Sequence, residues 1–181
     1  MKPTTLTSRM KSMKLEASEA RERLREQYRP PSVTVLFVGE SPPASGRFFY
    51  QANSGLYRAI QSAFIKAFPV LDHQDFLKQF QAAGCYLTDL CAKPVDRLDR
   101  NERMRVCREG EIRLAETIKH LQPEIIISVV RSISMNVTRA LKRAEWVGRH
   151  FNLPYPGRWH RHQLEFEQAL LPILRADVHL S

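Results

Sequence analysis

Cysteine is scarce in this chain, and long apolar runs are missing. The three cysteines, Cys85, Cys91 and Cys107, are odd in number and form no CxxC pair, which argues against a disulfide framework and predicts reduced thiols. No stretch approaches the roughly 18 apolar residues that cross a bilayer, and the first residues lack the pattern of a secretory leader. These absences argue against the secreted and membrane-spanning classes, so we expect a cytoplasmic protein with no membrane partner.

Positive charge is in excess. The 181 residues include 28 lysines and arginines against 19 acidic residues, which gives a formal net charge of +9. Such a balance favours a polyanionic partner, nucleic acid above all. With 43% hydrophobic residues and no repeat or low-complexity segment, the composition is that of a globular protein. We predict a flexible tail over residues 1–14 and a single domain over residues 15–181 that acts as a monomer.

Strand-like and helix-like segments alternate along the chain. Amphipathic patterns predict helices, the first over Leu15–Tyr28, and short apolar runs between them predict strands. The strands are expected at Val33–Val38, Cys85–Thr88, Ile125–Val130 and within Trp146–Leu153. This alternation is typical of a three-layer α/β/α sandwich with a mostly parallel four-stranded sheet. Right-handed crossovers then bring the loops after all four strands to one edge.

The loop after the first expected strand concentrates residues suited to a binding site. Gly39-Glu40-Ser41-Pro42-Pro43 places one acid between a glycine and two prolines, and Gly46-Arg47-Phe48-Phe49-Tyr50 follows. In an open α/β sheet such loops line the ligand crevice. A stiff loop with a carboxylate beside aromatic rings can hold a flat ring and do chemistry next to it. The alternative is an ordinary strand-to-helix connection with Glu40 in solvent.

These segments resemble two motifs of the uracil-DNA glycosylase superfamily, Gly-Glu-Ala-Pro-Gly and, after a spacer, Gly-Arg-Pro-Phe. Gly39-Glu40-Ser41-Pro42 fits the first, with Pro43 in place of its second glycine, and Gly46-Arg47-Phe48-Phe49 fits the second after a shortened spacer. The order of elements over Val33–Leu174 is also similar. The resemblance implies a DNA glycosylase, a hydrolase of the N-glycosidic bond of a modified or deaminated base in DNA.

The same resemblance implies roles for single residues. Glu40 would position or activate water for attack at the sugar carbon, and Phe49 would stack on the flipped base, with Ser41 and Pro42 also in the base pocket. Stacking on an aromatic ring offsets part of the cost of taking a base out of the duplex. A plain core role is the alternative for Phe49.

Asp89 is a departure from the family pattern. Relatives end the second strand with Thr-Asn, whose asparagine reads the edge of uracil, whereas this chain has Thr88-Asp89. An ionised aspartate only accepts hydrogen bonds, so it suits a ring edge that presents donors, and a base other than uracil is expected. A turn or cap role is the alternative for Asp89.

A second departure follows the fourth expected strand. The family's His-Pro-Ser motif supplies a histidine that stabilises the departing base anion, whereas this chain has Tyr155-Pro156-Gly157. Tyr155 takes the histidine's place as the second catalytic residue, but a neutral phenol donates one hydrogen bond and offers no cation. His160 or His162, at the start of the following helix, is the candidate replacement.

Cofactors are not expected. Several relatives hold an iron–sulfur cluster through four cysteines, and this chain has three, none in its N-terminal helix. A zinc site built from Cys85 or Cys91 with His160 or His162 lacks the ligand spacing of known sites. We therefore predict no metal and no cofactor.

Basic and aromatic residues alternate near the expected site. Arg158, Trp159, His160 and Arg161 follow the fourth strand, and Arg47 lies in the first loop. Such residues stack on bases while their charges hold phosphates; a solvated helix face with core tryptophans is the alternative. DNA glycosylase is the leading prediction. The alternatives are a catalytically weak or inactive nucleic-acid-binding module on the same fold, and a pocket for a free nucleoside or nucleotide.

Overall fold

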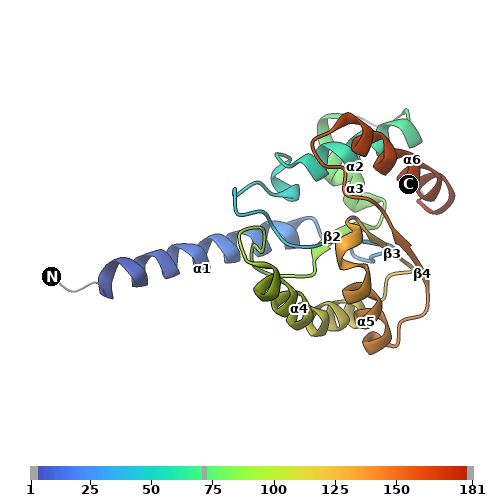
Figure 1. Cartoon of the computed structure of the whole chain (residues 1–181). Coiled ribbons are helices and arrows are strands. Elements are labelled where there is room, and N and C mark those ends of the chain that lie inside the picture. Colours follow the sequence, from blue (N-terminus) through green and yellow to red (C-terminus); the bar gives the residue numbers. More distant parts are fainter. Residues whose placement is uncertain (1–3, 71–72, 179–181) are drawn as a thin grey trace.

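A parallel sheet between two helical layers forms the body of the protein (Figure 1). The computed structural model describes residues 4–70 and 73–178. The strands lie in the order β2-β1-β3-β4 and all pairs are parallel. Their bounds are Val35–Gly39 for β1, Cys85–Asp89 for β2, Ile125–Ser128 for β3 and Arg149–Asn152 for β4. The predicted three-layer sandwich with a four-stranded sheet is confirmed.

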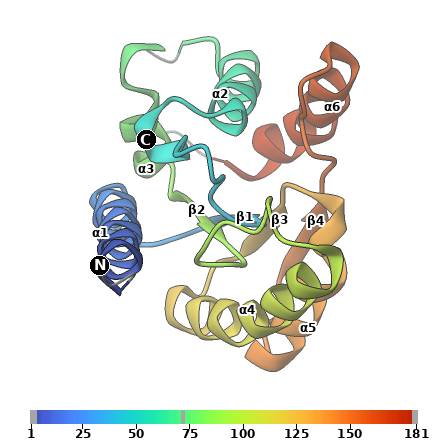
Figure 2. The ribbon, with the colours of Figure 1, turned by 60° about the vertical axis from the view of Figure 1, so that its left-hand side comes forward.

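Helices cover both faces of the sheet. Figures 1 and 2 show α2, α3 and α6 on one face and α4 and α5 on the other, while α1 runs beside the edge strand β2 and extends away from the body. The bounds are Thr4–Gln27 for α1, Gly55–Ala67 for α2, Phe76–Ala82 for α3, Arg100–Leu121 for α4, Ser134–Ala144 for α5 and His160–Asp177 for α6. Within the described residues, none of these helices is long and apolar enough to cross a membrane.

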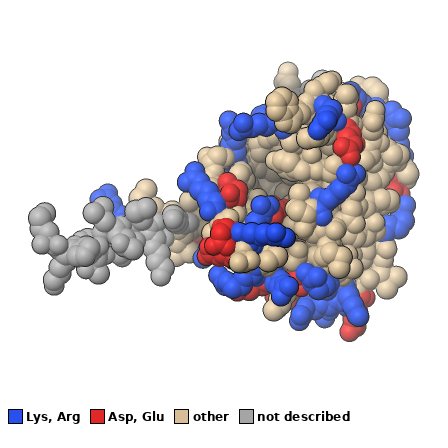
Figure 3. Space-filling view, viewed as in Figure 1, with Lys and Arg blue, Asp and Glu red and all other residues tan. Residues whose placement is uncertain are grey.

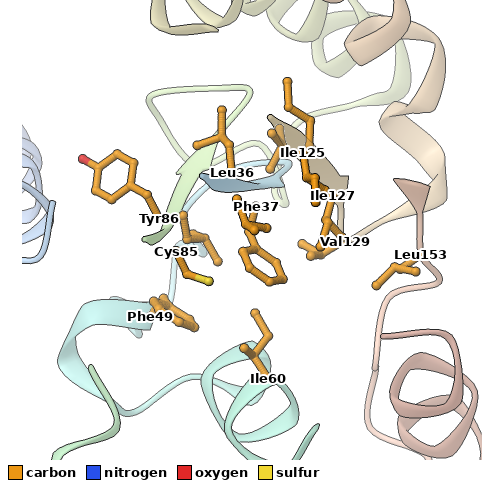
Figure 4. Packing of buried hydrophobic residues seen from close by; sticks show 14 of the residues in the cluster. Leu36, Phe37, Phe49, Ile60, Cys85, Tyr86, Ile125, Ile127, Val129 and Leu153 are labelled. Carbon is orange, nitrogen blue, oxygen red and sulfur yellow. The ribbon is translucent and has the colours of Figure 1, made fainter. Parts of the chain in front are cut away.

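The central strand β1 anchors the core. Its residues Val35–Val38 are fully buried, because a parallel strand flanked by helices has no solvent face. Figure 4 shows Phe37 pointing toward Phe49 and Ile60, while Leu36 points to the opposite face. The continuous apolar run that predicted this strand therefore packs against the helices on both faces of the sheet.

The N-terminal segment differs from its sequence prediction. Helix α1 begins at Thr4 rather than Leu15, so residues 4–14 of the predicted tail belong to a helix, while residues 1–3 lie outside the described residues. The sequence has neither glycine nor proline between Pro3 and Pro30. Once a helix is nucleated, each further residue without a breaker extends it at little cost. Lack of apolar periodicity was a poor guide here, because extension of an existing helix does not need a buried stripe.

Helix α4 lies unusually close to the loop after β2. A Cβ atom at Gly110 would stand 2.3 Å from the carbonyl oxygen of Leu90, so only glycine permits this approach. The helix begins at the N-cap Asp99, whose carboxylate accepts hydrogen bonds from the backbone N–H groups of Asn101 and Glu102. These bonds satisfy two N–H groups of the first turn, which have no partner within the helix.

Candidate active site

A cavity of about 310 Å³ opens at the carboxyl edge of the sheet. The chain passes from β1 to β2 on one side and then to β3 on the other, and such a switch in strand order is where open α/β sheets bind ligands. Six of the predicted site residues line this cavity: Glu40, Ser41, Pro42, Phe49, Asp89 and Tyr155. The fold thus brings together residues more than 100 positions apart in the sequence.

The loops after β1 and β2 are fastened to each other. The backbone N–H of Cys91 donates to the carbonyl of Glu40 at 2.8 Å. The N–H of Val95 donates to the hydroxyl of Ser41 at 3.3 Å, while the buried Pro42 stiffens the same loop. Ser41 therefore supports the shape of the loop in addition to lining the cavity.

Glu40 is held by an arginine that the sequence did not single out. Arg103 of α4 forms a two-pronged contact with the carboxylate, Nε to Oε1 at 2.8 Å and Nη2 to Oε2 at 2.5 Å. The Glu40 side chain is 18% exposed and that of Arg103 42%. Pairs this accessible to water contribute roughly 0–1 kcal/mol to stability, so the main effect of the pair is to orient the Glu40 carboxylate at the cavity wall.

Two phenylalanines form the aromatic wall. Phe49, the predicted stacking residue, and its neighbour Phe48 both line the cavity, yet both are almost fully buried. Phe49 also packs on Phe80, with ring centroids 5.3 Å apart. Phe49 therefore lies both in the cavity wall and in the core, and its stacking on a base stays a prediction.

Below this wall, the hydroxyl of Tyr50 is part of the sheet's hydrogen bonding. It donates to the carbonyl of Leu87 at 3.1 Å and accepts the Leu87 N–H at 2.7 Å. Burial raises the pKa of Tyr50 well above its ordinary value, so this hydroxyl stays neutral and structural.

Asp89 lines the cavity, and its carboxylate forms a salt bridge with an arginine that does not line the cavity. Arg25 of α1 donates to Oδ2 at 2.7 Å and also contacts Glu22, while Arg113 of α4 donates to the backbone carbonyl of Asp89. Burial raises the pKa of Asp89, and the charges of Arg25 and Arg113 oppose that rise. The side chains of Arg25 and Asp89 are 4% and 9% exposed. Removing one partner of a pair this buried costs about 3–5 kcal/mol.

Tyr155 stands at the rim of the cavity. It follows β4 and is 52% exposed, and partial burial raises the pKa of its phenol. Its hydroxyl is therefore a neutral hydrogen-bond donor near neutral pH. Neither His160 nor His162 lines the cavity, so the position predicted for an imidazole is occupied by the phenol alone.

The predicted nucleic-acid contacts lie outside the cavity. All are solvent-exposed, and they comprise Arg47, Arg158, Trp159, His160 and Arg161. Trp159, at 71% exposure, is available for contact with a partner. Trp146 is different, since its indole N–H donates to the carbonyl of Pro123 at 2.7 Å. It follows that Trp146 is a structural residue, as the alternative interpretation held.

Two thiols pack behind the Glu40 loop. The sulfur atoms of Cys91 and Cys107 lie 3.6 Å apart, and both residues are buried. Burial raises the pKa of both thiols. Because the thiolate is the reactive form, these cysteines are packing residues at neutral pH.

The family assignment agrees with this geometry. The sequence model of the uracil DNA glycosylase superfamily matches residues 26–175, and the chain belongs to that superfamily. The predicted resemblance is confirmed. A search of curated proteins found no match.

Sequence reasoning missed the two arginines that hold the site's acids. Arg25 lies in a helix of alternating charges, whose sequence does not distinguish this buried arginine from its less buried neighbours. Arg103 offered a weak signal, because it lies in the first turn of the helix after β2, and the amino ends of such helices face the carboxyl edge of the sheet.

Proposed function

We propose that this protein is a DNA glycosylase that hydrolyses the N-glycosidic bond of an altered base. The observation that carries the proposal is the meeting of Glu40, the Phe48 and Phe49 rings and Asp89 around one cavity at the carboxyl edge of the sheet. Its volume, about 310 Å³, is at the small end of ligand pockets. A pocket of this kind suits a single base removed from the duplex.

The proposed reaction assigns a part to each side of the cavity. The Glu40 carboxylate, oriented by Arg103, holds a water molecule for attack at the sugar carbon. The water oxygen bonds to that carbon and gives up a proton to the Glu40 carboxylate, while the N-glycosidic bond breaks and the electron pair of that bond leaves with the base. The Tyr155 hydroxyl, at the rim, donates a hydrogen bond to the departing base, which takes up a proton from solvent.

DNA is the proposed partner because positive charge gathers where a duplex would approach. Figure 3 shows a hollow in the body of the molecule with Lys and Arg side chains around it and fewer acidic ones. Arg158 and the exposed Trp159 lie in the loop that also carries Tyr155, and Arg161 follows in the first turn of α6. Arginines beside an exposed aromatic ring suit contact with phosphates and unstacked bases.

A second candidate is a nucleic-acid-binding module without chemistry. The specific observation in its favour is the contact of Arg103 with both oxygens of Glu40, because oxygens that accept from an arginine are less available to hold a water molecule. Under this alternative the protein binds duplex DNA with a steep salt dependence but releases no base. A nucleotide pocket would show a shallow salt slope instead.

The test is base release from labelled duplexes that carry uracil, hypoxanthine, xanthine or a thymine mismatch, read as alkali-labile abasic sites. Glu40→Gln should lower the rate roughly 100-fold or more, as expected on losing a general base, with DNA affinity unchanged. Glu109→Gln is the matched control. Like Glu40, Glu109 forms an ion pair with an arginine of α4, Arg105, at 2.5 Å, but both side chains of this pair are exposed to solvent.

Either outcome is informative. Base release lost in Glu40→Gln and kept in Glu109→Gln supports the glycosylase proposal. Absence of release from every duplex, with salt-dependent DNA binding intact, would contradict it and favour the binding module.

A further inference from the structure

One carboxylate oxygen of Asp89, Oδ1, lies beside Gly39, and both residues line the cavity. Gly39 pairs with Asp89 across β1 and β2, and a Cβ atom at position 39 would stand 2.5 Å from Oδ1. Because both residues line the cavity, Oδ1 lies along the bare backbone of Gly39. No side chain at position 39 separates this oxygen from a ligand.

Arg25 holds the other oxygen from outside the cavity. Its Nη2 donates to Oδ2 of Asp89 at 2.7 Å, and its guanidinium carbon lies 5.4 Å from the ring centroid of Phe48. Arg25 is 3% exposed and is not among the lining residues. It therefore supports two walls of the cavity, the carboxylate and the ring, without touching the ligand space.

Burial of the Arg25 guanidinium carries a desolvation cost. Its buried Nε has no hydrogen-bond partner among the described residues, and an unpaired buried N–H is rare in native proteins. A buried cation that is incompletely paired, directly behind the residue that replaces the family's base-reading asparagine, indicates a role in what the cavity accepts.

The chemistry of the ligand follows from an acceptor held in this way. With Arg25 bound to Oδ2, the carboxylate is fixed as an acceptor and offers no donor. The ring N–H of uracil lies between two carbonyl oxygens. These oxygens would face the carboxylate and repel it, because both groups are acceptors. A ring N–H beside an exocyclic amine, as in guanine, presents two neighbouring donors, which can share Oδ1, the oxygen that Arg25 does not hold.

We propose that Arg25 is a positioning residue that fixes Asp89 as an acceptor, so that the cavity selects a base edge with an amino group beside a ring N–H. This rests on the proposed function only in that the cavity holds a base. It does not require that the protein cleave the bond.

Binding of nucleosides tests the proposal without catalysis. Guanosine, inosine and uridine are titrated against the full-length protein at millimolar concentration, with saturation-transfer NMR as the readout. Guanosine should bind at least about tenfold more tightly than uridine, since one charge-assisted hydrogen bond is worth about a factor of ten, and inosine, which lacks the amine, should lie between them.

Asp89→Asn should invert the order. Arg25 requires an oxygen partner, so the new amide turns its nitrogen toward the cavity and offers a donor, which suits a carbonyl of uridine. This variant also carries the test if substitutions of Arg25 prevent folding. Loss of guanosine binding with a matching gain for uridine cannot come from a merely structural role.

Arg25→Met tests the positioning residue itself. The charged and titratable groups that interact with Asp89 are Arg25, Glu22 and Arg21 on α1, Arg113 on α4, and the buried Tyr50. Without Arg25 the burial of Asp89 is less opposed, so guanosine affinity should begin to fall at a higher pH than in the wild type as the solution is acidified. Arg25→Lys keeps the charge and should restore part of the affinity.

Arg29→Met is the matched control, because it removes a cation one turn further along, beyond the end of α1, that pairs with Glu26 and not with Asp89. The ranking and pH profile of this control should match those of the wild type. Equal binding of guanosine and uridine, an unchanged order in Asp89→Asn, or no binding of any nucleoside would each overturn the inference. Cleavage of uracil duplexes in those circumstances would leave the glycosylase proposal standing.

Discussion

Gly39→Ala is the sharpest structural test of the site, because the added atom meets a defined neighbour. The new Cβ would lie 2.5 Å from Oδ1 of Asp89 and 3.7 Å from its Cγ. Overpacking of this kind costs about 1–3 kcal/mol. Any glycine-to-alanine change also stabilises a protein by about 0.4–1 kcal/mol through the unfolded chain where the backbone permits alanine. The net expectation is a lower free energy of unfolding.

A matched control isolates the contact. Gly55, the first residue of α2, is exposed and has nothing within 4 Å of its would-be Cβ. Gly55→Ala has the same effect on the unfolded chain, so the two variants should differ by about 1–3 kcal/mol, the cost of the clash alone. Urea unfolding, with midpoint and slope both recorded, measures the difference.

A double-mutant cycle shows whether Asp89 is the cause. In an Asp89→Ala background the opposing oxygen is gone, so Gly39→Ala should cost about as little as Gly55→Ala. If Gly39→Ala destabilises the protein equally in both backgrounds, the contact with Asp89 does not carry the effect. The placement of Oδ1 beside Gly39 would then be wrong, and the nucleoside selectivity inferred from it would lose its basis.

Three further predictions concern the support of the site. Tyr50→Phe leaves the backbone N–H and carbonyl of Leu87 without their buried partner and should lower the free energy of unfolding in urea by about 1–3 kcal/mol. Gly110→Ala should cost more than Gly39→Ala in the same assay, because its Cβ meets the backbone oxygen of Leu90, which cannot rotate away; an equal or smaller cost would contradict the close approach of α4. Burial lowers the pKa of His150 from its ordinary 6.5, so its contribution to stability is complete above that value and is lost as pH falls through the lowered pKa. His150→Asn should flatten the unfolding midpoints measured between pH 7 and pH 5, and an unchanged slope would show that other groups govern the acid side.

The central strands were predictable because burial on both faces of a sheet requires a continuous run of apolar residues. Val35–Val38 and Ile125–Ile127 are apolar at every position, and all are buried. The fourth strand is different, since Arg149–Asn152 is exposed or half-buried along its length. Only its place between helices α5 and α6 indicated it, and its bounds within Trp146–Leu153 could not be derived from residue types.

The site was predictable only in part, for a related reason. Glu40 directly follows β1 and Asp89 is the last residue of β2, and topology alone brings the carboxyl ends of parallel strands together. Arg25 and Arg103 reach the site as long side chains from helices. Which arginine of a charged helix turns inward depends on helix placement, and a single sequence holds no separate signal for that.

The two acids of the cavity are held in the same manner but at very different cost. Arg103 contacts Glu40 at a partly exposed position, where the desolvation cost is small. The pair between Arg25 and Asp89 is almost fully buried, and well-packed apolar residues in place of such a pair are often neutral or stabilising. Folding alone therefore does not account for a buried ion pair in a cavity wall. The base selection inferred above gives a reason to keep one charged acceptor in place, and the Asp89→Asn and Arg25→Met variants test that reason separately from stability.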